Sequence, residues 1–169
     1  YRGKRLAESL ELALFCCPRC RQIGTLRSKD DWISCACGMT LRYGDDGFFS
    51  PPEPFETLAE WEDWQQETLR NMQTEPGKAL FSDEPIRLSR VVPGHREKAM
   101  GSGRLTLYPE ALHFGTHLFP LEKIGSMAMV QKRLLLFSCG EEYYELRAEK
   151  GVNLRKYLSW WKIISEKQE

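Results

Sequence analysis

The stretch 17–38 reads CPRC at residues 17–20, continues through 14 further residues and ends in CACG at residues 35–38. Closely spaced cysteines direct two thiolates to one point, and 14 residues are enough for a hairpin that returns the second pair to the first. Pro18 stiffens the first turn, and Gly38 permits an unusual backbone angle after the second. Four thiolates form the soft, tetrahedral ligand set that Zn²⁺ prefers. The sequence therefore predicts a ribbon with one structural Zn²⁺ and four ligands: Cys17, Cys20, Cys35 and Cys37.

Several features of these cysteines leave alternatives open. Cys16 is a second candidate ligand beside Cys17, although three residues separate it from Cys20. The two pairs could form disulfides, but no export signal opens the chain, which favours metal binding in a reducing compartment. The CPRC motif could be a redox pair, but such pairs accompany a βαβ unit that is not visible here. The second pair, Cys-x-Cys, is one residue shorter than is usual in ribbons, which affects the expected local geometry.

Composition and charge describe a folded chain with three unequal segments. Of its 169 residues, 41% are apolar and 28% are charged, as in globular proteins with a core. Residues 1–47 hold 8 Lys/Arg against 6 Asp/Glu, residues 48–84 hold 2 against 9, and residues 85–169 hold 14 against 9. The acidic segment could dock on the basic one or form a solvated helix face. Because the chain begins at Tyr1 without a signal sequence and lacks an apolar run of bilayer length, we expect a cytoplasmic fragment of a longer protein.

The first 79 residues predict a ribbon followed by a helix. Apolar positions at helical spacing over Leu6–Phe15 predict a short N-terminal helix. Strands are expected at 23–27, 32–34 and 39–43, around the cysteine motifs. Prolines within 51–54 mark a linker. A capping box formed by the threonine and glutamate of the sequence TLAE then predicts a helix over 58–72.

The remainder of the chain is predicted to be mainly β-structure. Alternating apolar residues indicate short strands between Ile86 and Arg147, and Gly101–Gly103 reads as a turn before one of them. Helical spacing returns over 153–165. The expected fold class is α+β, with an antiparallel barrel or sandwich capped by a C-terminal helix. The expected domains are a zinc ribbon with its helical stump at 1–50, a linker and amphipathic helix at 51–79, and the β domain at 80–169.

Motifs that carry catalysis are missing from this sequence. None of the three histidines (His95, His113 and His117) is followed by an aspartate at the spacing of an acyltransfer motif, and His113 and His117 fall near predicted strands. No nucleophile elbow, phosphate-binding loop or zinc-protease motif is present. We therefore expect that this chain is not an enzyme by itself.

Part of the sequence resembles a known family of enzymes. The cysteine motifs, together with CPRCRQIGTL at 17–26 and EWEDWQ at 60–65, resemble the region after the catalytic domain in some bacterial lysophospholipid (1-acylglycerol-3-phosphate) acyltransferase-like proteins. The family's catalytic histidine and aspartate have no counterpart here. The resemblance implies that an active site lies upstream of Tyr1 and that the upstream catalytic domain is a partner of this region.

A second resemblance concerns the β domain. GRLTLYPEALHF at 103–114, followed by FPLEKI at 119–124, is similar to the strand pairs of GRAM and pleckstrin-homology (PH)-like domains. This likeness is a pattern of hydrophobic residues. It implies that residues 80–169 form a PH/GRAM-like domain.

Three functions follow as hypotheses. The first is a non-catalytic accessory region of a membrane-lipid acyltransferase, with structural zinc and weak docking to a membrane or to the parent enzyme. The second is a nucleic-acid-binding ribbon using Trp32, Tyr43 and Arg27, which a net charge near zero disfavours. The third is a protein-interaction module, to which tryptophans could contribute, although core packing is the simpler role for them and Trp64 or Trp160 could face outward. The tryptophans in question are Trp61, Trp64, Trp160 and Trp161.

The basic last segment suggests a peripheral contact with an anionic membrane surface. Basic residues near such a surface each contribute about 1 kcal/mol, and salt weakens the attraction. Several of these side chains are expected to gather at one end of the β domain. The candidates are Arg87, Arg90, Arg96, Lys98, Lys132 and Arg133.

Overall fold

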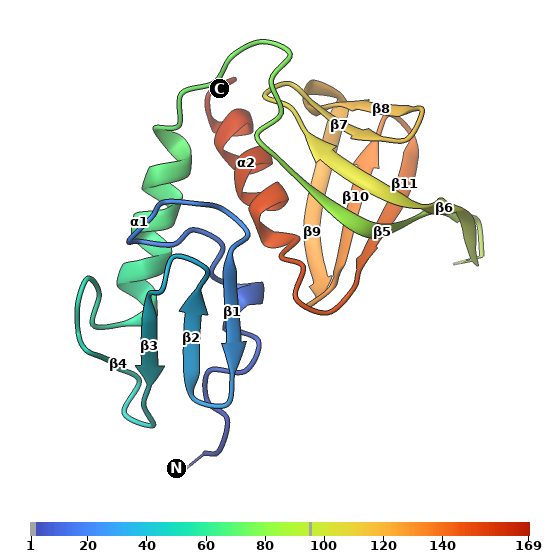
Figure 1. Ribbon diagram of the computed structural model, residues 1–169. Coiled ribbons are helices and arrows are strands. Elements are labelled where there is room, and N and C mark those ends of the chain that lie inside the picture. The colour runs from blue at the N-terminus through green and yellow to red at the C-terminus, as the bar shows by residue number, and fades with distance from the viewer. Residues whose placement is uncertain (1–2, 95) are drawn as a thin grey trace. The chain divides into compact units, whose positions relative to one another are not determined.

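The structure is a computed structural model that describes residues 3–94 and 96–169. Contacts within the chain divide it into two compact units, Tyr1–Asn71 (unit 1) and Met72–Glu169 (unit 2). Figure 1 colours the chain from blue at the N-terminus to red at the C-terminus. Each unit contains an antiparallel sheet and one α-helix among the described residues. The fold is therefore α+β, as the sequence predicted.

Unit 1 is built on a four-stranded sheet with the strand order β1-β2-β3-β4. The three strands predicted around the cysteine motifs are present, with the first shifted toward the C-terminus. The β1–β2 turn includes Asp30, whose φ of 54° lies in the left-handed region that Asp tolerates. The sequence did not predict the short β4. The elements are η1 (Leu10–Leu12), β1 (Leu26–Lys29), β2 (Trp32–Cys35), β3 (Thr40–Tyr43), β4 (Phe49–Ser50) and α1 (Leu58–Arg70).

The helix predicted over Leu6–Phe15 is wrong, because only the three residues of the 3₁₀-helix η1 are helical there. Ser9 precedes η1 with a φ of 72°, which interrupts a right-handed helix. The backbone upstream bonds to the β1–β2 turn instead: Ala7 N donates to the carbonyl of Asp30 at 3.0 Å. The N-terminal segment is therefore part of the ribbon.

The capping box predicted at the start of α1 is confirmed. Glu60 N donates to the Thr57 hydroxyl at 3.3 Å, and Thr57 N donates to the Glu60 carboxylate at 3.2 Å. Trp61 and Leu69, on one face of α1, are buried in unit 1. The helix that the sequence placed in a linker segment thus packs within the first unit.

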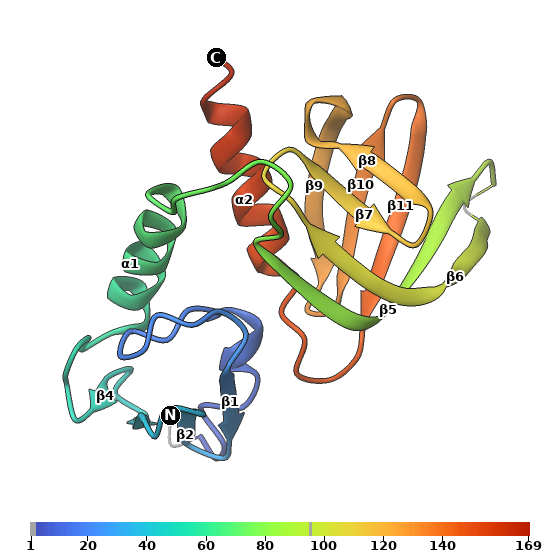
Figure 2. The same ribbon diagram turned by 45° about the horizontal axis from the view of Figure 1, so that its top comes forward.

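Unit 2 is a seven-stranded antiparallel sheet with the strand order β8-β7-β6-β5-β11-β10-β9. Figure 2 shows that this sheet is strongly curled and that helix α2 lies beside it. The Trp161 indole N–H donates to the carbonyl of Ile124 at 3.3 Å, which ties α2 to the start of β9. The elements are β5 (Phe81–Val92), β6 (Arg96–Leu107), β7 (Ala111–Phe114), β8 (His117–Pro120), η2 (Leu121–Lys123), β9 (Ile124–Gln131), β10 (Leu134–Cys139), β11 (Glu142–Ala148) and α2 (Arg155–Glu166).

The turn predicted at Gly101–Gly103 is wrong, because these residues lie inside β6. Gly101 pairs with Leu88 of β5, and Gly103 pairs with Ile86 of the same strand. Gly101 has a φ of 136°, and the register shifts next to it, so glycine accommodates an irregular strand here. The long antiparallel pairing of β5 with β6 runs through these residues in place of the predicted turn.

A buried polar network ties α2 to β5. Lys156 has a side chain that is only 2% exposed, and its Nζ lies 2.7 Å from an Asp83 carboxylate oxygen. The Tyr157 hydroxyl donates to the same carboxylate at 2.6 Å. Burial and the neighbouring Asp83 raise the pKa of Tyr157, so its hydroxyl keeps the proton that it donates. The ammonium group also lies over the Phe81 ring, 5.1 Å from its centroid.

The tryptophans take mainly internal positions. Trp61 and Trp160 are buried, and Trp64 and Trp161 are half-buried. The suggestion that Trp160 could face outward is therefore wrong; its indole N–H donates to the carbonyl of Pro109 at 3.2 Å. Trp32 is 48% exposed. None of the described helices has the length and apolar character that crossing a bilayer would require.

Candidate metal centre

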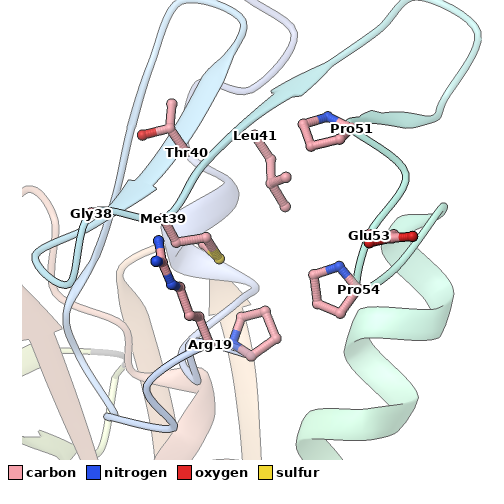
Figure 3. Close-up of a pocket in the computed structure, with 9 residues that line it drawn as sticks. Arg19, Gly38, Met39, Thr40, Leu41, Pro51, Glu53 and Pro54 are labelled. Carbon is pink, nitrogen blue, oxygen red and sulfur yellow. The ribbon is translucent and has the colours of Figure 1, made fainter.

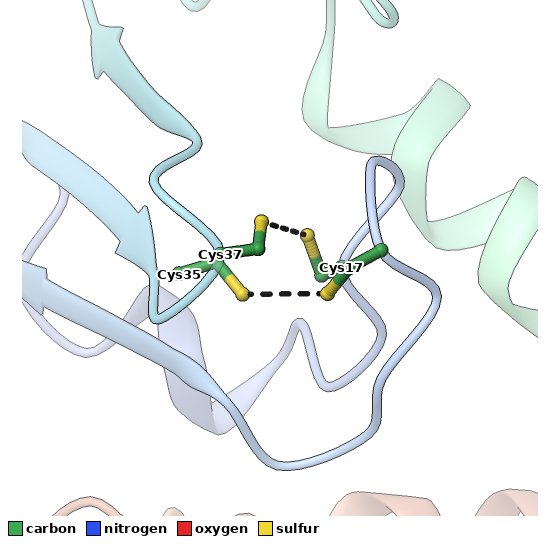
Figure 4. Close-up of side chains that lie close together, drawn as sticks. Cys17, Cys35 and Cys37 are labelled. Carbon is green, nitrogen blue, oxygen red and sulfur yellow. Dashed lines mark hydrogen bonds between the residues drawn. The ribbon is translucent and has the colours of Figure 1, made fainter.

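Four cysteine sulfurs meet at one end of the ribbon. The Sγ atoms of Cys17, Cys20, Cys35 and Cys37 all lie within 4.8 Å of one another. The Cys17 and Cys37 sulfurs are 3.8 Å apart, and the Cys20 and Cys35 sulfurs are 3.7 Å apart. Figure 4 shows the two turns facing each other, with these two contacts as dashed lines. The predicted ligand set is therefore brought together by the fold.

Two tight backbone turns position the sulfurs. Arg21 N donates to the carbonyl of Cys17 at 2.8 Å, and Gly38 N donates to the carbonyl of Cys35 at 2.9 Å. The second turn ends at Gly38, whose φ of 95° would strain any other residue. The shorter Cys-x-Cys spacing thus still forms a compact turn, because glycine follows it directly.

The surroundings shift the pKa values of Cys17 and Cys35 in opposite directions. Burial raises the pKa of Cys17 to about 12, although the amides of Cys20 and Arg19 partly offset this. Burial also acts to raise the pKa of Cys35. It is outweighed by the Cys37 amide and the Thr25 hydroxyl, among other hydrogen bonds, so the Cys35 pKa is lowered to about 7. The Thr25 oxygen is 3.1 Å from the Cys35 sulfur.

Helix α1 holds the segment that precedes the first turn. The Gln65 side chain is buried; its carbonyl accepts from Phe15 N at 3.0 Å, and its amide donates to the carbonyl of Ala13 at 3.0 Å. The Trp61 indole N–H donates to the carbonyl of Cys16 at 2.9 Å. We call Trp61 and Gln65 the α1 clamp. It fixes the backbone immediately before Cys17, and sequence reasoning did not identify it as part of the site.

The remaining cysteines lie apart from the cluster. Cys16 is buried, and its sulfur contacts the carbonyl of Arg21 at 3.7 Å. Cys139 lies at the end of β10 in unit 2. All six cysteines are free thiols in the structure, so the disulfide alternative has no counterpart in it. Cys17, rather than Cys16, joins the other three sulfurs.

The spacing of the sulfurs fits a tetrahedral metal site. With metal–sulfur bonds of about 2.3 Å, as for Zn²⁺, a regular tetrahedron places its corners about 3.8 Å apart. The two closest sulfur pairs lie at 3.8 and 3.7 Å. The cysteine cluster could therefore hold one metal ion without a large rearrangement. Four protein ligands would complete such a shell and leave no coordination position for water or substrate.

The basic residues predicted to share one end occupy two places. Arg90 pairs with Lys98, and Val92 pairs with Arg96, so Arg90, Lys98 and Arg96 lie near the end of β5 and the beginning of β6. Lys132 and Arg133 lie in the β9–β10 turn, where the carbonyl of Arg133 accepts from Ala148 N.

Arg87 belongs with the second of these places. It pairs directly with Arg147, a residue that sequence reasoning did not single out, and Arg147 in turn pairs with Leu134, which follows Arg133. Directly opposed cations destabilise a sheet unless something neutralises them. The Arg87–Arg147 pair is apparent only from the register in which β11 pairs with β5.

The residues considered for nucleic-acid stacking differ in exposure. Tyr43 packs inward against Phe49, with ring centroids 5.0 Å apart. The Arg27 guanidinium donates to the carbonyls of Leu26 and Gly24. Trp32 remains exposed beside Arg42, its partner in the β2–β3 pairing.

Two of the three histidines lie in strands of unit 2 that the structure describes. His113 lies in β7, with its ring 4.5 Å from that of Tyr108, and His117 begins β8 beside Phe119. His95 lies outside the described residues.

Comparison with known proteins does not place the chain in a family. No protein-family model matches it, and a search of curated proteins finds no significant relative.

Proposed function

We propose that unit 1 binds one structural Zn²⁺ through Cys17, Cys20, Cys35 and Cys37, and that the chain is a non-catalytic accessory region. The observation that carries the zinc assignment is the convergence of four thiols from two turns at tetrahedral spacing. All-thiolate sites with tetrahedral geometry favour zinc or iron–sulfur chemistry, and a closed four-cysteine shell for a single ion is the usual structural zinc site.

Metal analysis of the purified chain tests the zinc assignment. One equivalent of zinc per chain is expected, and Cys37→Ser should lose most of it because the variant keeps only three thiolates. Cys16→Ser and Cys139→Ser are the matched controls, since each removes a thiol outside the cluster. Equal metal loss from Cys16→Ser would reassign the ligands, and a metal-free wild-type ribbon that stays folded would refute the proposal.

The accessory role is a proposal that rests on the resemblance of the ribbon to the region after the catalytic domain of lysophospholipid acyltransferase-like proteins. The upstream catalytic domain of such an enzyme would be the partner of this chain, and residues 80–169 would be its PH/GRAM-like module. The full reading frame tests this directly, because it should contain a His-x-x-x-x-Asp motif upstream. The pure chain should not turn over an acyl donor with lysophosphatidate, and turnover would contradict the proposal.

We propose that contact with an anionic membrane is weak. The end of β5 and the beginning of β6 carry Arg90, Arg96 and Lys98. Three such residues would contribute about 3 kcal/mol at an anionic surface. Sedimentation with phosphatidylserine vesicles at low and high salt should show weak binding that salt abolishes. Arg90→Glu with Lys98→Glu should reduce it more than Lys132→Glu with Arg133→Glu, and an equal effect would contradict this placement.

A further inference from the structure

A pocket of about 590 Å³ opens in unit 1 beside the first residues of β3. Figure 3 shows it between β3 and the segment that carries Pro51 and Pro54, with Arg19 at its edge. The zinc assignment gives this pocket no role, because the cysteine sulfurs belong to the facing turns and not to its lining.

The pocket exists because β4 ends early. Arg42 of β3 lies opposite Ser50 of β4. If the same register continued, Pro52 would lie opposite Thr40. Proline has no N–H and cannot donate to a neighbouring strand, so the ladder cannot extend to Thr40. The sequence PPEP at 51–54 therefore ends the strand pairing and turns the chain away from β3.

The backbone of Thr40 is directed toward this gap. On the other side of β3, Tyr43 N donates to the carbonyl of Asp31, and Cys35 N donates to the carbonyl of Met39. Alternate residues of an antiparallel strand direct their N–H and C=O groups to opposite sides. Thr40, one residue from Met39, therefore directs both groups away from β2. Within residues 3–94 and 96–169, β4 is the only strand that pairs with this side of β3, and it stops before Thr40.

The floor of the pocket is apolar, and its rim carries opposite charges. Met39 and Leu41 are core residues of unit 1 whose outer edges line the pocket. Arg19 and Glu53 are exposed on its two sides. For neither side chain is an ion pair found among the described residues, so both charges are available to a ligand. An open strand edge beside a side-chain pocket can receive an added strand, because main-chain hydrogen bonds supply the affinity and the pocket supplies the specificity.

We propose that this pocket binds a short extended peptide of a partner protein, which adds to β3 at Thr40. A peptide residue opposite Thr40 would exchange two hydrogen bonds with it, as in an antiparallel pair. The peptide residues on either side would share the face of Met39 and Leu41, because side chains alternate along a strand. One of these two peptide residues is apolar and packs on the apolar floor of the pocket. An acidic side chain of the peptide lies next to Arg19 and complements its positive charge.

Selection from a random heptapeptide library on the zinc-loaded full chain tests this proposal. The expected result is a consensus that combines an apolar residue with an acidic one. The selected peptide should bind Arg19→Glu at least ~10-fold more weakly, which corresponds to the loss of about one charged contact. A new selection on Arg19→Glu should replace the acidic position by a basic one.

Matched variants separate the pocket from its surroundings. Arg21→Glu makes the same charge change beside the same turn, outside the pocket lining, and should leave the peptide affinity unchanged. Thr40→Pro removes the N–H at the open edge and should abolish binding, whereas Thr40→Val keeps the backbone and should not. The zinc content of every variant is measured, so that metal loss is not mistaken for pocket loss. Absence of any consensus, equal effects of Arg19→Glu and Arg21→Glu, or a Thr40 amide whose hydrogen exchange the peptide does not slow would each overturn the proposal.

Discussion

The buried cores of the two units of this protein differ in composition. In unit 1, Cys17, Cys35 and Met39 belong to the buried cluster itself, so the cysteine site and the core are continuous. In unit 2 the core comes from strand residues and α2, and a buried Lys156–Asp83 ion pair ties the two together. Small units bury a low fraction of their surface and commonly need a metal or a disulfide. If unit 1 binds zinc as proposed, we expect the metal dependence to be confined to unit 1.

The largest expected effect is the loss of unit 1 when metal is removed. Structural zinc contributes about 10–16 kcal/mol in small zinc domains, more than the stability of most units of this size. A strong chelator should therefore unfold unit 1 and leave unit 2 folded. Amide NMR spectra should lose dispersion for residues 3–71 alone. Retained dispersion in those residues, or simultaneous collapse of unit 2, would contradict the contrast between the units.

The second effect should be confined to unit 2. Lys156→Ala leaves the Asp83 carboxylate, 15% exposed, without its ammonium partner. Removing one member of a buried ion pair costs about 3–5 kcal/mol, so thermal unfolding of unit 2 should shift strongly downward. Lys162→Ala is the control, because Lys162 is exposed on the same helix. Zinc content should not change in either variant, and similar melting temperatures for the two would show that the ion pair does not stabilise α2.

A third, intermediate effect tests whether α1 supports the metal site. Gln65→Ala removes the side chain that bonds the backbone at Ala13 and Phe15, and should destabilise unit 1 by about 1–3 kcal/mol. The variant should still bind one zinc but release it faster to a competing chelator. Asp63→Ala, on the exposed side of α1, should behave as wild type. Unchanged release from Gln65→Ala would show that the α1 clamp acts independently of the metal site.

The smallest expected effect concerns Glu145 in unit 2. Burial and the neighbouring Glu97 carboxyl raise the pKa of Glu145, so its ionised form opposes folding at pH values above the ordinary 4.5. Glu145→Gln should raise the melting temperature of unit 2 by about 1–4 °C at pH 7, since removing a like-charge contact gains about 0.2–1 kcal/mol. As pH falls below 4.5 the gain should vanish, because the wild-type carboxyl is then protonated too. A gain that does not depend on pH would assign the effect to packing.

Local signals in the sequence predicted much of this structure. The spacing of the cysteines predicted the cluster because both turns and the hairpin between them lie within 21 residues. Thr57 and Glu60 predicted the start of α1, since a capping box is complete within four residues. The short strands of unit 2 followed from alternation. Each of these signals is determined by neighbours in the chain.

Features that depend on distant residues could not be predicted in this way. Gln65 lies about 50 positions from Phe15, and nothing in its local sequence marks it as a buried clamp. Lys156 looks like a solvated helix residue until the fold brings Asp83 beside it. The glycines at 101 and 103 suggest a turn when only neighbouring residues are considered. Their pairing with β5, which is distant in sequence, places them in a strand instead. Tertiary context decided these positions.

The α1 clamp also sets an order of events during synthesis. Both cysteine turns are complete once Cys37 has left the ribosome, whereas Trp61 and Gln65 follow 24 and 28 residues later. Contacts close in sequence form quickly, and those across 45 to 50 positions form later. Under the proposed zinc assignment, the nascent ribbon would bind its metal while its apolar side is still uncovered, and α1 would then close over it. Chain growth would thus place the proposed metal-binding step before the closure of α1 over the ribbon.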